Sequence, residues 1–211
     1  NFSTTPAGTT ISCNGLSDGE VRVSVFGGTP PYSYLWSDAS TLDSITSKPA
    51  GTYWVEITDG NSCVHNDTTV FTEPTAFSST LTKQDVICKG ESSGWIKANP
   101  VGGSPLYSYL WSPLSQTTDS IGSLPTGFYD VTITDLNGCQ VYDSVTVFEP
   151  DTLVPLITSI QFFGDVNVRC YGDSTAVVSV QVTGGTSPYT YQWSNGSTAD
   201  TLYNLPAGTV S

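Results

Sequence analysis

The chain of 211 residues contains no methionine, a single histidine and only six lysine and arginine residues. Against these stand 19 aspartate and glutamate residues, which give a formal net charge of −13. With so few cations the chain has no basic surface to neutralise nucleic-acid phosphates, and its charge disfavours anionic membranes. We therefore expect no nucleic-acid partner. The acidity is consistent with solubility alone or with bound cations.

Long hydrophobic runs are also missing. No stretch approaches the roughly 20 apolar residues of a membrane-spanning helix, and the first residues lack the basic-then-apolar pattern of a signal segment. We expect no membrane insertion in this segment. Residues 4–8 (Thr-Thr-Pro-Ala-Gly) have the composition of a linker, so we predict an internal fragment of a larger secreted protein.

What the sequence does contain is one motif three times over. A Gly-Gly pair, one or two prolines and then Tyr-x-Tyr-x-Trp occur at residues 27–36, 102–111 and 184–193. The glycines and prolines favour a turn, and the alternating rings favour a strand. Trp36, Trp111 and Trp193 lie 75 and 82 residues apart, which predicts tandem repeats.

Each repeat shows short alternating segments separated by polar turns, which is typical of strands. We predict an all-β chain of tandem immunoglobulin-like antiparallel β-sandwiches, arranged as beads on a string. Residues 1–10 are predicted to be a linker, residues 11–74 the first repeat, 75–150 the second and 151–211 an incomplete third repeat without its final strands. Either the parent chain continues or a neighbouring subunit supplies those strands.

The aromatic residues have two interpretations. In one, the strand rings form a flat sugar-binding platform; in the other, which is the prediction we adopt, the tryptophans pack in the sandwich core. The predicted core aromatic residues are Trp36, Trp111, Trp193, Tyr53 and Tyr129, of which the two tyrosines stand at the position of a tyrosine corner. Trp54 and Trp95 do not occur in every repeat and are better candidates for exposed contacts.

The five cysteines occur at equivalent positions in the repeats. Cys13 and Cys63 bracket the first repeat and Cys88 and Cys139 the second, so we predict disulfides Cys13–Cys63 and Cys88–Cys139. Cys170 is predicted to be unpaired within this fragment. Each bond would stabilise its repeat by roughly 4 kcal/mol through loop-closure entropy. A zinc or redox site is disfavoured without a Cys-x-x-Cys pair, and disulfides place the chain outside the cytoplasm.

Together these motifs resemble the SprB repeat family. The shared pattern is an opening Cys-x-Gly, the Gly-Gly…Tyr-x-Tyr-x-Trp centre, Leu-Pro-Ala-Gly-x-Tyr, an Asn-Gly-Cys turn and a closing Glu-Pro, which here is Glu73-Pro74 and Glu149-Pro150. The resemblance implies a segment of a very large extracellular, cell-surface adhesin of gliding Bacteroidota, exported by type IX secretion.

A second resemblance concerns modification. Secreted proteins of this group carry O-linked glycans on Asp-Ser/Thr followed by an aliphatic residue or threonine. The matching candidates are Ser44, Thr68, Ser120, Ser144, Thr152, Ser174 and Thr201. Their alternative role is a simple turn or a solvated strand edge, whereas glycans on edge strands would block aggregation.

Two pairs of polar side chains are candidate metal ligands. Asp59 with Asn61, and Asp135 with Asn137, place oxygen atoms two residues apart in tight turns. These residues are calcium candidates, although Asx side chains in such turns usually bond to their own backbone. No other cofactor is expected. No catalytic constellation recurs between repeats, so we predict no enzyme activity.

We therefore interpret the chain as a non-enzymatic repeat segment of a surface adhesin or filament that acts in attachment or gliding-type motility. Its expected partners are extracellular surfaces or polysaccharide, and neighbouring repeats or subunits of the same protein. The alternatives are a spacer or carbohydrate-binding module of a secreted hydrolase and a self-assembling fibre subunit.

Overall fold

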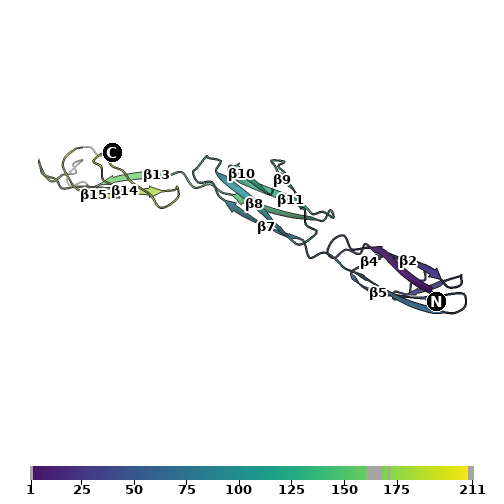
Figure 1. Ribbon diagram of the computed structural model, residues 1–211. Coiled ribbons are helices and arrows are strands. Elements are labelled where there is room, and N and C mark those ends of the chain that lie inside the picture. The colour runs from purple at the N-terminus through teal and green to yellow at the C-terminus, as the bar shows by residue number, and fades with distance from the viewer. Residues whose placement is uncertain (1, 161–167, 171, 209–211) are drawn as a thin grey trace. The chain divides into compact units, whose positions relative to one another are not determined.

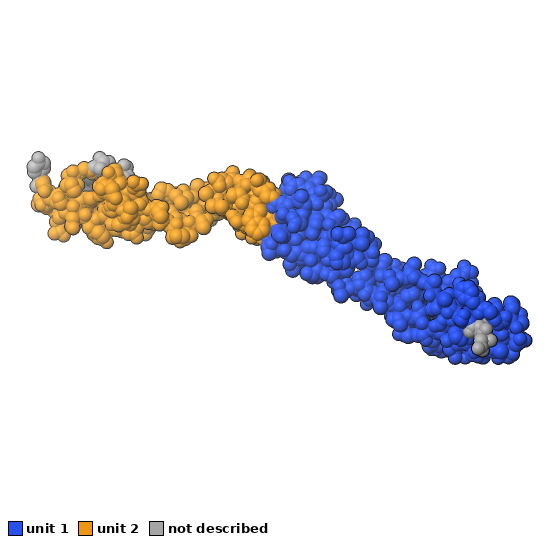
Figure 2. Space-filling view, in the orientation of Figure 1, with its two compact units in different colours: residues 1–82, 97–121, 129–145 blue, residues 83–96, 122–128, 146–211 orange. Residues whose placement is uncertain are grey.

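The structure is a computed structural model that describes residues 2–160, 168–170 and 172–208. Within these residues the chain forms strands and turns and no helix (Figure 1). It divides into two compact units, residues 1–82, 97–121 and 129–145, and residues 83–96, 122–128 and 146–211 (Figure 2). The strands are β1 (Phe2–Thr9), β2 (Gly19–Gly27), β3 (Ser33–Trp36), β4 (Ser44–Lys48), β5 (Gly51–Thr58), β6 (Val64–Phe71), β7 (Ser78–Gln84), β8 (Gly94–Val101), β9 (Ser108–Ser112), β10 (Ser120–Leu124), β11 (Gly127–Thr134), β12 (Gln140–Val147), β13 (Val154–Ser159), β14 (Ala176–Thr183) and β15 (Thr201–Leu205).

The first repeat is a sandwich of two antiparallel three-stranded sheets. One sheet has the order β1-β2-β4 and the other the order β3-β5-β6. Alternate residues of the strands point inward and meet in one core between the sheets. That core consists of Ile11, Val21, Val23, Trp36, Ile45, Val55, Ile57 and Phe71. The all-β, immunoglobulin-like sandwich predicted from the sequence is confirmed.

Residues 2–9 form a strand and not the predicted linker. Phe2–Thr9 forms strand β1, which pairs with β2 over its whole length, from Phe2 opposite Gly27 to Thr9 opposite Glu20. Pro6 and Gly8 gave this stretch the composition of a linker, but β1 is an edge strand, where a proline costs no ladder hydrogen bond. The strand is therefore part of the first repeat, whose predicted start at residue 11 is too late.

The region of the second repeat has the same strand order. Its sheets are β10-β8-β7 and β12-β11-β9. In β9 and β11, Trp111 lies opposite Val131, just as Trp36 lies opposite Val55 in β3 and β5. The equivalent register shows that the sequence repeat is also a structural repeat.

The third repeat forms one sheet, β13-β14-β15, over a small core of Val178, Trp193 and Leu202. The aromatic segment that is β3 in the first repeat and β9 in the second has no strand pairing at residues 189–193. In the other repeats this segment pairs with β5 or β11. No strand equivalent to these lies beside it in the described residues, so its backbone lacks the partner that would make it a strand.

Candidate functional site: the junction between the first two repeats

The Gly-Gly…Trp motif is held by the same hydrogen bonds in each repeat. The hydroxyl of its first tyrosine donates to the carbonyl of the first glycine, from Tyr32 to Gly27 at 2.6 Å, from Tyr107 to Gly102 at 2.8 Å and from Tyr189 to Gly184 at 2.5 Å. The first glycine has a positive φ in all three repeats, which favours a residue without Cβ. The motif is therefore a structural device that fixes the turn.

The tryptophan that ends the motif lies in the core. Trp36 and Trp111 are each 1% exposed and Trp193 is 6% exposed. The indole N–H of Trp36 donates to the carbonyl of Leu42 at 2.9 Å, so its one polar group is satisfied. Because these rings are buried, they form no sugar-binding platform.

Of the two tyrosines of the predicted corner, Tyr53 is half-buried and forms a hydrogen bond back to the preceding turn. The Tyr53 hydroxyl donates to the carbonyl of Pro49, four residues upstream, at 3.2 Å. Tyr129 is buried, and burial raises the pKa of its phenol. A tyrosine hydroxyl that bonds back to the preceding turn is a feature of immunoglobulin-like domains.

The four calcium candidates organise two loops at hairpin tips. Oδ1 of Asp59 accepts hydrogen bonds from the amides of Asn61 and Cys63, both at 2.9 Å, and Oδ2 accepts one from Thr29 at 3.1 Å. The backbone hydrogen bonds, chiefly that from Cys63, lower the pKa of the Asp59 carboxyl below its ordinary value of 3.8. This buried carboxylate holds its own loop in place.

The equivalent loop in the second repeat has the same bonds. Oδ1 of Asp135 accepts from Asn137 and Cys139 at 2.9 Å, and Oδ2 accepts from Ser104 at 2.8 Å. The loops thus take the geometry of the alternative interpretation, in which Asx side chains bond to nearby backbone. Among the residues that the structure describes, no group of three or more His, Cys, Asp or Glu side chains is placed to hold a metal ion.

The disulfide of the structure is not one of the two predicted. Cys13 is bonded to Cys139, with a Cα–Cα distance of 5.8 Å, while Cys63 and Cys88 are free and exposed. Cys170 is also free. The predictions Cys13–Cys63 and Cys88–Cys139 are therefore corrected: the bond joins the opening cysteine of the first repeat to the closing cysteine of the second.

The length of a hairpin explains this pairing. Cys63 lies in the tip between β5 and β6, next to the Thr58–Val64 end of the ladder. Cys13 lies near the opposite end, since the amide of Ile11 donates to Thr72 at 3.3 Å. Seven steps of a β-ladder span about 24 Å, whereas a disulfide requires Cα atoms within about 7 Å. The two cysteines of one repeat thus cannot reach each other.

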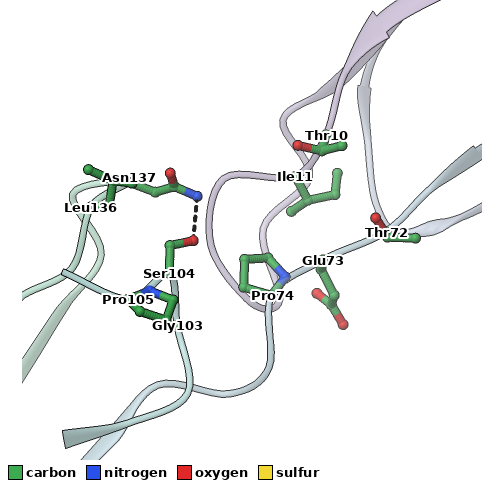
Figure 3. A pocket seen from close by; sticks show the side chains of 10 residues that line it. All are labelled: Thr10, Ile11, Thr72, Glu73, Pro74, Gly103, Ser104, Pro105, Leu136 and Asn137. Atoms are coloured by element: carbon green, nitrogen blue, oxygen red, sulfur yellow. Dashed lines mark hydrogen bonds between the residues drawn. The ribbon is translucent and has the colours of Figure 1, made fainter.

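The disulfide stands beside a shallow groove of about 370 Å³. The amide of the Asn137 side chain donates to the Ser12 carbonyl at 2.9 Å and to Oγ of Ser104 at 2.8 Å, the second of which is drawn in Figure 3. The groove is lined by Thr10, Ile11, Thr72, Glu73, Pro74, Gly103, Ser104, Pro105, Leu136 and Asn137 (Figure 3). These residues and both cysteines belong to one compact unit. The spacing of the motifs in the sequence did not predict this junction. It identifies equivalent positions in the repeats, but it does not show which ends of two repeats meet.

The glycosylation candidates lie mostly at exposed strand edges. Thr68, Ser120, Ser144, Thr152 and Ser174 are exposed, and Ser44 and Thr201 are half-buried. Ser44, Ser120 and Thr201 each begin an edge strand, namely β4, β10 and β15. The aspartate carbonyls just before them accept hydrogen bonds at 2.9 Å from the neighbouring strands, as from Val23 to Asp43.

The two tryptophans outside the repeat motif are at the surface. Trp54 on β5 is 47% exposed and Trp95 on β8 is 39% exposed. The Trp95 indole N–H donates to the side chain of Gln84 at 2.8 Å. Leu35 and Val70, 44% and 59% exposed, lie on the strands that flank β5.

A two-sheet sandwich with a buried tryptophan and a tyrosine bonded to its preceding turn defines an immunoglobulin-like repeat protein. Residues 8–41, 80–116 and 166–198 match the SprB repeat. The chain belongs to the SprB repeat family. In the described residues no helix is long and apolar enough to cross a membrane.

Comparison with solved structures gives distant similarities. An amphioxus IgVJ-C2 molecule is 13% identical, with a TM-score of 0.29 over 69% of this chain and 95% of that chain. A tetra-tandem repeat in the extending region of a large adhesion protein is 15% identical, with a TM-score of 0.29 over 98% of this chain and 66% of that one. The N-terminal four Ig domains of a Dscam1 isoform are 11% identical, with a TM-score of 0.23 over 96% and 65%. No curated protein gives a significant match.

Proposed function

We propose that the chain is a non-catalytic segment of a large secreted adhesin or filament at the cell surface, acting in attachment or gliding-type motility. The observation that carries the proposal is the Cys13–Cys139 bond, which ties two neighbouring repeats covalently. Such a tie suits a protein that transmits tension outside the cytoplasm, where disulfides persist. Membership of the SprB repeat family supports the same conclusion.

In this proposal, repeats of similar sandwiches supply reach and many weak contacts. Many weak contacts made together give avidity without a single strong site. The partners are extracellular surfaces or polysaccharide, together with neighbouring repeats or subunits. The acidic surface, with a formal net charge of −13, disfavours polyanionic partners such as nucleic acid.

A carbohydrate-binding role has one specific observation in its favour. Trp54 presents 47% of its surface on β5, beside the exposed Leu35 and Val70 of the flanking strands. Sugars bind to exposed aromatic faces of this kind, whereas the buried Trp36 is unavailable to them. This surface would serve an adhesin and a module of a secreted hydrolase equally well.

The experiment measures adhesion under flow. Beads coated with the oxidised chain are allowed to settle on polysaccharide-coated glass, and the shear that removes half of them is recorded. We expect retention above that of albumin-coated beads and a loss of retention for Trp54→Ala, with Trp95→Ala as the comparison for a tryptophan on another strand. Retention equal to albumin on polysaccharide, protein-coated and bare glass alike would contradict the adhesin proposal.

A further inference from the structure

Three exposed cysteines, Cys63, Cys88 and Cys170, are not used by the disulfide of the structure. In the repeat, Cys88 and Cys170 are equivalent to the bonded Cys13, and Cys63 is equivalent to its bonded partner. We propose that each is one half of the same junction, so that every opening cysteine bonds to the closing cysteine of the repeat that follows. The partner of each is thus a repeat of this design.

The opening turn is closed by the same hydrogen bond in all three repeats. The carbonyl of the opening cysteine accepts a hydrogen bond from the amide three residues later, from Leu16 at 3.1 Å, Glu91 at 3.2 Å and Asp173 at 3.0 Å. The glycine two positions after the cysteine has a φ of 79°, 79° and 87° in turn. Cys88 and Cys170 are therefore displayed on the same turn as the bonded cysteine.

In the first two repeats, a glutamate from the last residues of the repeat also holds the opening turn. The amide of Gly15 donates to Oε2 of Glu73 at 2.6 Å, and the amide of Gly90 donates to Oε2 of Glu149 at 2.9 Å. Both glutamates stand in the closing Glu-Pro pair. The free turn around Cys88 is thus built in the same way as the turn that forms the disulfide.

The closing loop is likewise the same whether or not its cysteine is bonded. The amide of Cys63 donates to Oδ1 of Asp59 at 2.9 Å, and the amide of Cys139 donates to Oδ1 of Asp135 at 2.9 Å. Each aspartate amide donates in return to the cysteine carbonyl, at 3.0 Å in both loops. The backbone of the free cysteine is therefore held by the same hydrogen bonds as that of the bonded one.

The side chain that reaches across the bonded junction is oriented by an equivalent hydrogen bond at the free site. Asn137, which reaches across the junction to the Ser12 carbonyl, is oriented by a 2.8 Å bond to Oγ of Ser104. At the equivalent position the side chain of Asn61 donates to Oγ1 of Thr29 at 2.8 Å. The loop of Cys63 is thus ready to receive the opening turn of another repeat.

Formation of the bond requires an oxidant, for which a small disulfide such as oxidised glutathione is sufficient. One cysteine thiolate attacks it, forming a mixed disulfide and releasing one reduced glutathione. The second thiolate then displaces the other glutathione, so that two protein thiols become one disulfide while two molecules of reduced glutathione are formed. Their thiol protons pass to the released glutathione thiolates, directly or through water.

The pairing rule makes successive links overlap. The bond from Cys13 to Cys139 encloses Cys88, whose own bond would run onward to the following repeat. A pulling force could then not extend any repeat of such a series without breaking a covalent bond. This resistance depends only on which cysteines are paired, and it is independent of the surface to which the chain adheres.

The test uses the whole chain, in which a second copy can supply the missing repeat. The protein is incubated in a buffer of oxidised and reduced glutathione, and cross-linked species are identified by non-reducing electrophoresis and by mass spectrometry of disulfide-linked peptides. We expect dimers and longer species in which Cys63 of one copy is joined to Cys170 or Cys88 of another.

Two variants with equal numbers of free thiols separate the proposal from random oxidation. Cys63→Ser keeps two opening cysteines and should stay monomeric, whereas Cys88→Ser keeps one cysteine of each kind and should cross-link. In both, the peptide carrying the Cys13–Cys139 link reports that the fold is intact. Equal cross-linking of the two variants, or linkages mainly between like cysteines, would overturn the proposal. So would a monomeric protein whose three thiols all become glutathionylated.

Discussion

The Cα atoms of Cys13 and Cys139 lie 5.8 Å apart, although 126 positions separate the two residues in the sequence. Their bond joins the end of one sandwich to a hairpin tip of the next. A force applied to the two ends of the chain therefore passes through the sulfur atoms and bypasses everything between them. On the chain-entropy estimate, closing a loop of this length stabilises the folded state by about 5 kcal/mol.

The first prediction concerns extension under force. When the chain is pulled from its ends, the double variant Cys13→Ser/Cys139→Ser should extend further than the oxidised protein, because the 126-residue separation is no longer bridged. At about 3.3 Å per residue the gain is about 400 Å. Single-molecule force spectroscopy measures it. Cys88→Ser serves as the control and should extend like the parent, and an unchanged final length in the double variant would refute the bypass.

The second prediction concerns one backbone position in two loops. Ser62 has a φ of 65°, and the equivalent Gly138 has a φ of 85°. Only glycine adopts this region without steric cost, so Ser62→Gly should raise the free energy of unfolding and Gly138→Ser should lower it, each by about 1 kcal/mol. Urea titration of both variants provides the measurement. Shifts of the same sign would show that backbone strain does not decide this position.

The third prediction concerns acid stability. The folded-state pKa of Asp59 lies below its ordinary value of 3.8, chiefly because the Cys63 amide bonds to the carboxylate. A depressed pKa contributes stability that is complete above the unfolded value and is lost as the pH falls through the folded value. Stability should therefore fall as the pH drops below about 4.

Substitution isolates the part due to this carboxylate. Asp59→Asn should be less stable than the parent at neutral pH, since its amide group turns a donor toward the Thr29 amide, and it should lose less on acidification. Thermal unfolding between pH 7 and pH 3 makes the comparison, with the exposed Glu20→Gln as control. An acid sensitivity in Asp59→Asn equal to that of the parent would contradict the assignment.

The fourth prediction contrasts a buried and an exposed tryptophan. Trp36 is 1% exposed in the first core, so Trp36→Ala should cost about 3–5 kcal/mol of stability. Trp54 is 47% exposed, and Trp54→Ala should cost less than about 1 kcal/mol. Denaturant titration of the two variants tests the difference. Comparable losses would mean that the burial pattern of β3 and β5 is not that of the folded protein.

The fifth prediction concerns modification at sheet edges. Ser120 begins the edge strand β10, is exposed and follows Asp119. In protein made by a host that glycosylates Asp-Ser/Thr sites, we expect the peptide containing this serine to be heavier by whole sugar units. The exposed Ser112, which follows Trp111, should remain bare. Mass spectrometry decides, and an unmodified Ser120 peptide from such a host would remove the proposal.

Much of the fold was accessible from local pattern. The short alternating segments predicted strands, and the three aromatic motifs predicted equivalent segments that end at Trp36, Trp111 and Trp193. Strand β1 was missed, because Pro6 and Gly8 have the composition of a linker and are tolerated in an edge strand. The aromatic segment of the third repeat was expected to be a strand and lacks one, because a strand also needs a neighbour.

By itself the sequence determined the repeat, the strand periodicity and the chemistry of each turn, since these depend on residues close together in the chain. Which cysteine bonds to which was decided only by tertiary structure. The length of the β5–β6 hairpin places Cys63 and Cys13 at opposite ends of one repeat. The meeting of two repeats then brings Cys13 to Cys139. The distance between these two cysteines cannot be derived from the spacing of residues close together in the chain.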